Sequence, residues 1–340
     1  MNGIEKVPYA GPERRTDSPS SSLLIGGSRD VYNIAEVEKT LGELSASAHE
    51  GQRTLYEKML RRGSSRSLVR PSNTDCLRPL YESCPNFSSV LDELTRSLAL
   101  SVLGCEPFQF TPLLLLGEPG IGKTHFAREL SKVLYTELQF VSMNSLTAGW
   151  VLTGSSAQWK NSGPGRVAKA FVHGEYANPL FLIDEIDKVP SEAQYDPMAG
   201  LYTLLEESTA RTFIDEFLEI PINTEYASWV ATANKINTIP GPILSRMSVH
   251  IVPTPTKNQS RGIGYNLYKE MIGKHDWGFQ SEPSEAVLEK LAAKPPRDMK
   301  QILRAAFGTA TLDRRDHLIP KDLDVDARIS KPPMGFCPEA

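Results

Sequence analysis

One stretch of the chain combines glycines, a lysine and a threonine at a spacing that could hold a triphosphate. It fits the pattern G-x-x-x-x-G-K-[ST] and reads Gly117-Glu118-Pro119-Gly120-Ile121-Gly122-Lys123-Thr124. The glycines let the backbone curl, so that its N–H groups point at phosphate oxygens, and a following helix adds positive potential. Lys123 would bridge the β- and γ-phosphates, and the Thr124 hydroxyl would ligate Mg²⁺. We therefore predict an ATP- or GTP-binding loop that extends to His125.

Two adjacent carboxylates, Asp184 and Glu185, follow an apolar run at 180–183. Such a run is typical of a parallel strand covered on both faces, and ligands bind at the carboxyl ends of these strands. Asp184 is expected to hold Mg²⁺, and Glu185 to orient and deprotonate an attacking water. The alternative is an ordinary solvated Asp-Glu pair. With a triphosphate loop upstream, the pair favours a hydrolase.

The elements that must position these residues alternate along the chain. Strands are predicted at 113–116, 138–143, 180–183, 229–232 and 249–252, and helices lie between them. Alternation of this kind indicates an α/β fold, a P-loop NTPase with a parallel sheet and flanking helices. From residue 257 onward the pattern is helical only, with helices predicted at 260–273, 284–293 and 297–313. This part is predicted to be a small all-helical lid.

The N-terminal part is predicted to be less regular. Ser, Pro, Gly and charge dominate the first thirty or so residues, which favours disorder. Helices are predicted at 31–44 and 51–62, and a polar linker at 61–73 carries Arg61, Arg62, Arg66 and Arg70. We interpret it as a solvated linker; the alternative is a contact with a partner or nucleic acid. The predicted segments are a disordered N-terminus (1–30), a helical region and linker (31–85), the nucleotide-binding domain (86–255), the lid (256–327) and a flexible tail (328–340).

Composition restricts the class of protein further. The chain has 340 residues and a net charge of −4, so nothing in its overall charge favours nucleic acid or an anionic membrane. No apolar stretch approaches the roughly 20 residues that span a bilayer, and no signal peptide is apparent. The 4 cysteines show neither metal-ligand nor disulfide spacing. We expect a cytoplasmic protein.

Residues 113–252 resemble the ATPase module of the Lon proteases, a branch of the AAA+ ATPases. The resemblance lies in the triphosphate loop, the acidic run 181–188, the strand end 231–234, the segment 213–221 and, above all, the string Thr238-Ile239-Pro240-Gly241-Pro242-Ile243-Leu244-Ser245-Arg246-Met247. It implies an ATP- and Mg²⁺-dependent ATPase that forms a homo-oligomeric ring, with a hexamer favoured. Neither the Lon peptidase domain nor its N-terminal substrate-binding domain is recognisable, so we do not carry over the peptidase activity.

The resemblance also assigns three further site residues. Asn234 matches the polar sensor that positions the attacking water; the alternative is an Asn that caps a strand end. Arg246 matches the arginine finger, which acts on the γ-phosphate of a neighbouring subunit; the alternative is an Arg paired with a local acid. Arg297 matches the second sensor. Its place in the first turn of a helix opposes the helix dipole, which suggests a role; the alternative is a solvated Arg beside Asp298.

A polar, glycine-rich loop at 154–166 carries one large aromatic residue, Trp159. When the loop is aligned on Pro164-Gly165-Arg166, Trp159 falls where Lon modules place the aromatic of their first pore loop. There it would grip an extended polypeptide, with Lys160 adding charge. The alternative is a Trp that folds back onto the core.

Two function classes remain. The first is a ring-shaped motor that remodels or unfolds proteins, with a separate peptidase or effector as an optional partner. The second is a regulatory or nucleic-acid-associated switch whose ATP cycle controls assembly. Trp159 and the near-neutral charge favour the motor, with a protein as substrate or partner. The arginines at 61–70 and the unassigned N-terminal region leave the switch open.

Overall fold

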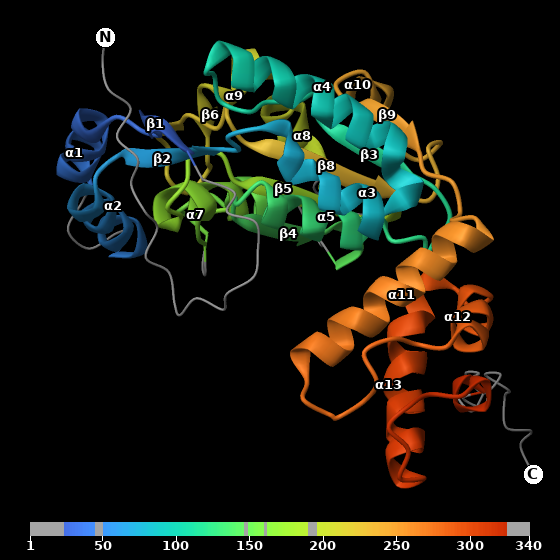
Figure 1. Cartoon of the computed structure of the whole chain (residues 1–340). Helices are drawn as coiled ribbons and strands as arrows, with labels where there is room; N and C mark the ends of the chain where they lie inside the picture. Colours follow the sequence, from blue (N-terminus) through green and yellow to red (C-terminus); the bar gives the residue numbers. More distant parts are fainter. Residues whose placement is uncertain (1–23, 45–49, 146–148, 160–161, 190–195, 325–340) are drawn as a thin grey trace, which may run out of the picture. The chain divides into compact units, whose positions relative to one another are not determined.

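The computed structural model describes residues 24–44, 50–145, 149–159, 162–189 and 196–324. These residues divide into two units (Figure 1). The first unit comprises the residues up to Leu80, Ser88–Gly117 and Lys123–Ile251, and the second comprises Tyr81–Phe87, Glu118–Gly122 and the residues from Val252 onward. The predicted flexible tail, 328–340, and most of the predicted disordered N-terminus lie outside the described residues.

A five-stranded parallel sheet forms the centre of the first unit, in the order β4-β5-β8-β3-β9. Its strands are β3 (Leu113–Leu116), β4 (Leu138–Ser142), β5 (Leu180–Asp184), β8 (Ser228–Ala233) and β9 (Ser248–Ile251). The apolar runs of β3 and β5 occupy interior positions, where both faces of the sheet are covered. The predicted α/β fold with a parallel sheet is confirmed. Because the strands are parallel, their carboxyl ends lie at one edge, where the polar residues that follow them can meet.

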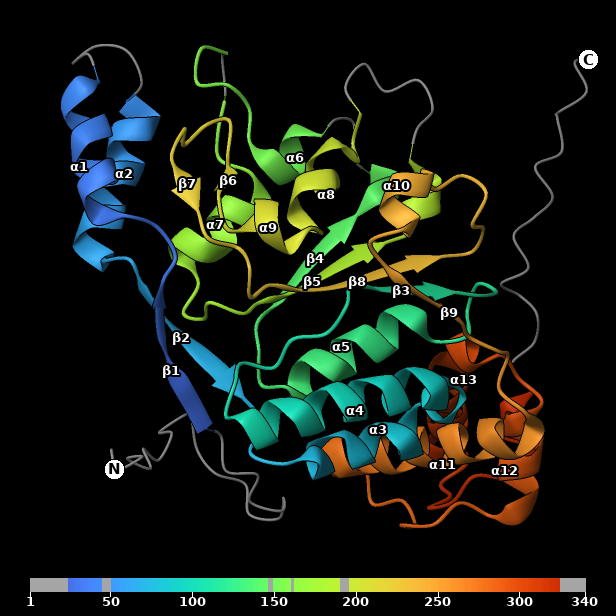
Figure 2. The ribbon, with the colours of Figure 1, turned by 90° about the horizontal axis from the view of Figure 1, so that it is seen from above.

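Helices cover both faces of this sheet. Figure 2 shows α4 (Ser88–Gly104) and α5 (Lys123–Val133) on one face, and α7 (Arg166–His173) and α8 (Ala199–Leu204) on the other. On the second face, Phe181 of β5 stacks on Phe171 of α7 and on Trp229 of β8, with ring centroids 6.5 and 4.4 Å apart. Short helices α6 (Trp150–Thr153), α9 (Glu207–Ala210) and α10 (Gly241–Leu244) complete this side.

The N-terminal part of the first unit is more ordered than its composition suggests. Strands β1 (Leu24–Asp30) and β2 (Ser65–Arg70) pair antiparallel, and helices α1 (Ile34–Glu43) and α2 (Glu50–Arg62) lie between them in the chain. The prediction of disorder over 1–30 is therefore wrong for residues 24–30. Residues 1–23 lie outside the described residues.

The prediction of a solvated basic linker at 61–73 is also wrong. Residues 61 and 62 end α2, and residues 65–70 form β2. Arg66 is buried, and its guanidinium group donates to the carbonyls of Phe171 and Val172 at 3.0 and 3.1 Å. Both carbonyls lie at the C-terminal end of α7. The free carbonyls at the C-terminal end of a helix attract a cation, so Arg66 stabilises the fold and does not face solvent.

A short hairpin precedes β8. Its strands β6 (Phe213–Ile214) and β7 (Pro221–Ile222) pair antiparallel, in the segment whose sequence resembles the hairpin of Lon modules.

The three helices predicted for the second unit are present: the long helices α11 (Lys257–Lys274) and α13 (Pro296–Leu312), and the shorter α12 (Glu285–Ala292). The remaining elements of the chain are short: the helix α3 (Arg78–Ser83) and the 3₁₀ turns η1 (Thr74–Leu77), η2 (Pro85–Phe87), η3 (Met143–Ser145), η4 (Ile186–Lys188) and η5 (Pro320–Leu323). Tyr268, Leu291, Leu303 and Phe307 belong to the apolar core of the helical unit.

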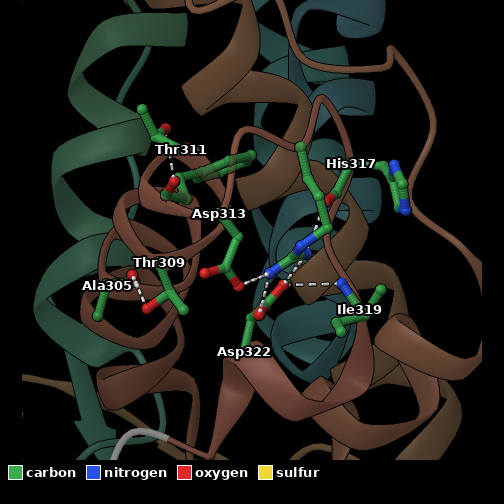
Figure 3. A network of polar contacts seen from close by, with 9 residues as sticks. Ala305, Thr309, Thr311, Asp313, His317, Ile319 and Asp322 are labelled. Atoms are coloured by element: carbon green, nitrogen blue, oxygen red, sulfur yellow. Dashed lines mark hydrogen bonds and ion pairs between the residues drawn. The ribbon is translucent and has the colours of Figure 1, made fainter.

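A network of polar contacts lies between the end of α13 and η5 (Figure 3). Arg315 donates from both terminal nitrogens to the carboxylate of Asp322, at 2.8 Å each, and also to Asp313 at 2.9 Å. The same carboxylate accepts from the backbone N–H of Ile319. These bonds fix η5 against the end of α13.

Among the described residues, none of the helices combines the length and the apolar character of a membrane-spanning segment.

Candidate nucleotide-hydrolysis site

Lys123, within the predicted triphosphate loop, is the first residue of α5. Its ammonium group donates to the carbonyl of Gly117 at 2.6 Å and to Oδ1 of Asn234 at 2.9 Å. Gly117 follows β3 and Asn234 follows the neighbouring strand β8, so the parallel sheet brings all three together. The lysine is 7% exposed, and its charge is held by acceptors that a phosphate oxygen could replace.

Thr124 and Asp184 meet across the gap between α5 and β5. The Thr124 hydroxyl donates to Oδ1 of Asp184 at 2.7 Å. A second hydroxyl, that of Thr232 in β8, donates to the same oxygen at 2.8 Å and accepts from the backbone N–H of Glu185 at 2.9 Å. Hydroxyl and carboxylate oxygens are the hard ligands that Mg²⁺ prefers, so this donor set fits the ion.

Glu185 has a backbone conformation that side-chain-bearing residues rarely adopt. Its φ of 55° lies in the left-handed region. Such a conformation persists only where its surroundings over-determine it, and here the hydroxyl of Thr232 binds the backbone N–H. The side chain is held as well, because Nδ2 of Asn144 donates to Oε2 of Glu185 at 2.6 Å.

Sequence reasoning missed Thr232 and Asn144. Asn144 follows β4, the neighbour of β5, so the rule that polar residues gather at the carboxyl edge of a parallel sheet could have identified it. Thr232 lies inside the mostly apolar strand β8, and threonine is common enough in strands to give no signal.

The tip of the triphosphate loop belongs to the second unit. Gly120 and Gly122 have φ values of 85° and 102°, which glycine adopts without strain. A Cβ atom at Gly120 would lie 3.6 Å from Cβ of Arg297, the predicted second sensor in the first turn of α13. Ile121 is buried, and its carbonyl accepts from Nδ2 of Asn86, which also donates to the carbonyl of Pro253. Within the second unit the loop tip therefore lies beside Arg297.

The remaining loop residues lie at the surface. Glu118, Pro119 and His125 are exposed, and Nδ1 of His125 lies 3.9 Å from Oε1 of Glu129.

The predicted arginine finger is paired within its own chain. Nε of Arg246 lies 3.1 Å from Oε2 of Glu206, and its Nη1 donates to the carbonyl of Pro242 at 2.7 Å. Both side chains line a cavity of about 450 Å³ in the first unit. This arrangement corresponds to the local-acid alternative, and a role across a subunit boundary would require the pair to separate.

The predicted substrate-gripping residue is at the surface. Trp159 is 44% exposed and packs edge-on against Trp150, with ring centroids 5.5 Å apart and planes at 87°. It is therefore not a core side chain. Lys160 lies outside the described residues.

Comparison with known proteins identifies a family for the sheet-containing part. Residues 113–254 match the model of AAA, the ATPase family associated with various cellular activities. The Lon protease of Lachnoclostridium phytofermentans is 31% identical over 188 residues, which cover 55% of this chain and 23% of that protease. The mitochondrial Lon protease homologue of Schizosaccharomyces pombe is 36% identical over 137 residues, 40% of this chain and 13% of the homologue. This chain thus matches less than a quarter of either relative.

A solved structure supports the fold. The closed-state cryo-EM reconstruction of Hsp104 with ATPγS and FITC-casein has a TM-score of 0.57, with 15% identity over 72% of this chain and 49% of that chain. The Lon-like AAA module that the sequence predicts is confirmed by the family match and by the Lon relatives.

Proposed function

We propose, from the premise that residues 113–254 are an AAA-family ATPase module related to that of Lon proteases, that this protein hydrolyses ATP to remodel or unfold other proteins. In this proposal residues 86–255 bind and hydrolyse the nucleotide, residues 256–327 form the lid, and the active form is a homo-oligomeric ring, with a hexamer favoured. The proteolysis of the Lon relatives is not part of the proposal.

The hydrolytic step follows from the bonds at the edge of the sheet. Lys123 would exchange its bonds to Gly117 and Asn234 for phosphate oxygens and would neutralise their charge. Glu185 would accept a proton from water as the water oxygen bonds to the γ-phosphorus and the bond to the β-phosphate oxygen breaks, which releases ADP and phosphate. Asn144 would hold the carboxylate in place.

Other residues would support that step. Thr124 and Asp184 would hold Mg²⁺, which would supply positive charge to the phosphate oxygens. Asn234 would position the water, and Arg297 would act on the γ-phosphate from the lid.

One observation carries the choice of protein remodelling: a large aromatic side chain, Trp159, is 44% exposed on a loop whose neighbouring residues are polar or small. A flat apolar surface can grip extended polypeptides of varied sequence. The alternative switch function was left open by the N-terminal region and by four arginines at 61–70. Arg66 and Arg70 are buried whereas Arg61 and Arg62 are exposed, so only two of the four could contact nucleic acid.

The test compares two tryptophan variants. Trp159→Ala should reduce the ratio of casein-stimulated to unstimulated ATPase rate toward one, whereas Trp159→Phe should preserve most of the stimulation. Trp277→Ala is the matched control, since Trp277 in the second unit is 41% exposed. An equal loss of stimulation in both alanine variants, or stimulation by DNA or RNA in place of casein, would argue for the switch.

A further inference from the structure

A buried carboxylate organises the turn between β6 and β7. Oδ1 of Asp215 accepts from the backbone N–H groups of Phe217 and Leu218, at 3.0 and 3.1 Å. Glu219 ends the turn at a φ of 54°, and its N–H donates to the carbonyl of Asp215 at 2.8 Å. Asp215 has no exposed surface. The segment Asp215–Glu219, which we call the 215–219 turn, is therefore a rigid unit.

The 215–219 turn holds both ends of the loop that carries Trp159. At the far end, Oδ2 of Asp215 accepts from the N–H of Gly165 at 2.8 Å. At the near end, the N–H of Glu216 donates to the carbonyl of Thr153 at 2.8 Å. The approach is so close that a Cβ atom at Gly154 would lie 2.4 Å from Oδ1 of Asp215. The position of the loop base is thus set by the turn.

Helix α2 binds the opposite side of the same turn. Nε2 of Gln52 donates to the carbonyl of Phe217 at 2.5 Å, and the hydroxyl of Tyr56 donates to the carbonyl of Leu218. Both side chains are buried, with exposures of 2% and 0%. Burial raises the pKa of Tyr56 to about 12, so its hydroxyl remains a donor at physiological pH. Phe217 and Leu218 therefore bind Asp215 through their N–H groups and α2 through their carbonyls.

We propose that Asp215 is a positioning residue for the Trp159 loop, and that the 215–219 turn transmits the state of helices α1 and α2 to this loop. Hydrogen bonds in a buried, low-dielectric setting are directional and costly to leave unmade, so a shift of α2 must move the turn and, with it, Gly165. A movement of α2 would thereby change the grip of Trp159 on its substrate. The inference rests on the proposed function of Trp159.

The chain offers two variants that cut the linkage at different bonds, and one matched control. Tyr56→Phe removes only the hydroxyl that binds Leu218. Asp215→Asn keeps the oxygen that binds Phe217 and Leu218 but turns an N–H donor toward the N–H of Gly165. The control is Tyr268→Phe, because Tyr268 is another buried tyrosine, and its hydroxyl donates to the carbonyl of Gln280 in the second unit at 2.8 Å.

The first readout is hydrogen exchange of the amides in peptides covering Gly154 to Gly165, which does not depend on any substrate. Tyr56→Phe and Asp215→Asn should each accelerate exchange there by about 3- to 10-fold, the loss expected for one hydrogen bond, and Tyr268→Phe should not. Equal exchange in Tyr56→Phe and Tyr268→Phe would overturn the linkage.

The second readout is the casein concentration that gives half-maximal ATPase stimulation. It should rise at least about threefold in the two linkage variants, while Tyr56→Phe keeps the unstimulated rate. Tyr268→Phe should change neither the half-maximal concentration nor the unstimulated rate. If casein does not stimulate the unaltered protein, the proposed function fails, and the exchange experiment still decides the linkage. If exchange accelerates but the half-maximal concentration is unchanged, the transmission to the Trp159 grip is refuted.

Discussion

Glu185 is held by two residues outside its own strand. Asn144, which follows β4, binds the side chain, and Thr232 of β8 binds the backbone N–H. A general base works only when its geometry is defined, and these bonds define it before any nucleotide binds.

Replacement of Glu185 tests this assignment. Glu185→Gln should lower the rate of phosphate release by at least about 100-fold while ATP still binds, because an amide keeps the shape but cannot accept the proton of water. Lys123→Ala is the comparison, and it should weaken ATP binding itself. Equilibrium nucleotide binding and phosphate release measure the two effects, and near-normal turnover in the glutamine variant would exclude Glu185 as the base.

The buried carboxyl of Asp215 should make the stability of the protein depend on pH. Burial raises the pKa of its carboxyl to about 6, and the charge of Glu216 adds to this, although the N–H groups of Gly165, Phe217 and Leu218 oppose it. A raised pKa means that the folded state binds the proton more tightly than the unfolded chain. The stabilisation is therefore complete at low pH and is lost as the pH rises through about 6.

The stability difference between Asp215→Asn and the unaltered protein should reveal this titration. Between pH 5 and pH 7 it should shift by about 1 kcal/mol in favour of the variant, because only the carboxyl loses a proton in that range. Urea unfolding at a series of pH values measures the difference. A difference that stays constant with pH would show that Asp215 titrates at its ordinary pKa.

At the scale of single elements, η5 depends on one ion pair. Arg315 binds the buried carboxylate of Asp322 with two hydrogen bonds, and these bonds lower the pKa of Asp322 (Figure 3). A lowered pKa stabilises the folded state above the unfolded value of 3.8, and this stabilisation is lost as the pH falls through the folded value.

Removal of the guanidinium group should therefore destabilise the protein in a pH-dependent way. Arg315→Ala should lower the melting temperature by several degrees at pH 7, because it leaves a buried carboxylate without its cation, and the deficit should shrink below pH 4. Arg304→Ala, at an exposed position of α13, is the control and should change little. Thermal melting at both pH values provides the measurement, and an equal effect of the two substitutions would contradict the structural role of the pair.

At the scale of the whole molecule, the pairing of Arg246 with Glu206 bears on assembly. If Arg246 acts on the γ-phosphate of a neighbouring subunit, a single chain hydrolyses ATP poorly, and specific activity should rise with protein concentration. Light scattering of the Glu185→Gln variant with ATP should then detect a ring. Activity that is independent of concentration in a monomeric protein would refute a role in trans.

Mixed subunits give a sharper test of the same idea. Arg246→Ala and Lys123→Ala should each be inactive alone, yet an equal mixture should recover up to about a quarter of the activity. In a randomly mixed ring, about half of the subunits keep Lys123, and about half of their neighbours keep Arg246. About a quarter of the interfaces therefore combine an intact loop with an intact finger. Recovery should be absent if the finger acts within its own chain.

The sequence by itself determined the features that local patterns encode. The triphosphate loop is a contiguous motif, and the runs 113–116 and 180–183 are apolar without interruption because their strands are covered on both faces. From parallel strands alone, residues 184 and 234 had to lie at one edge, and the structure places Lys123 against Asn234 and Thr124 against Asp184.

Only the tertiary structure decided the contacts between residues far apart in the chain. Arg66 has the same charge whether it is solvated or caps the end of α7, so composition could not separate the two. The bonds of Gln52 to Phe217 and of Asp215 to Gly165 join segments with no shared periodicity. A single side-chain hydrogen bond leaves no pattern in a sequence, because its donor and acceptor meet only after the sheet and helices have packed.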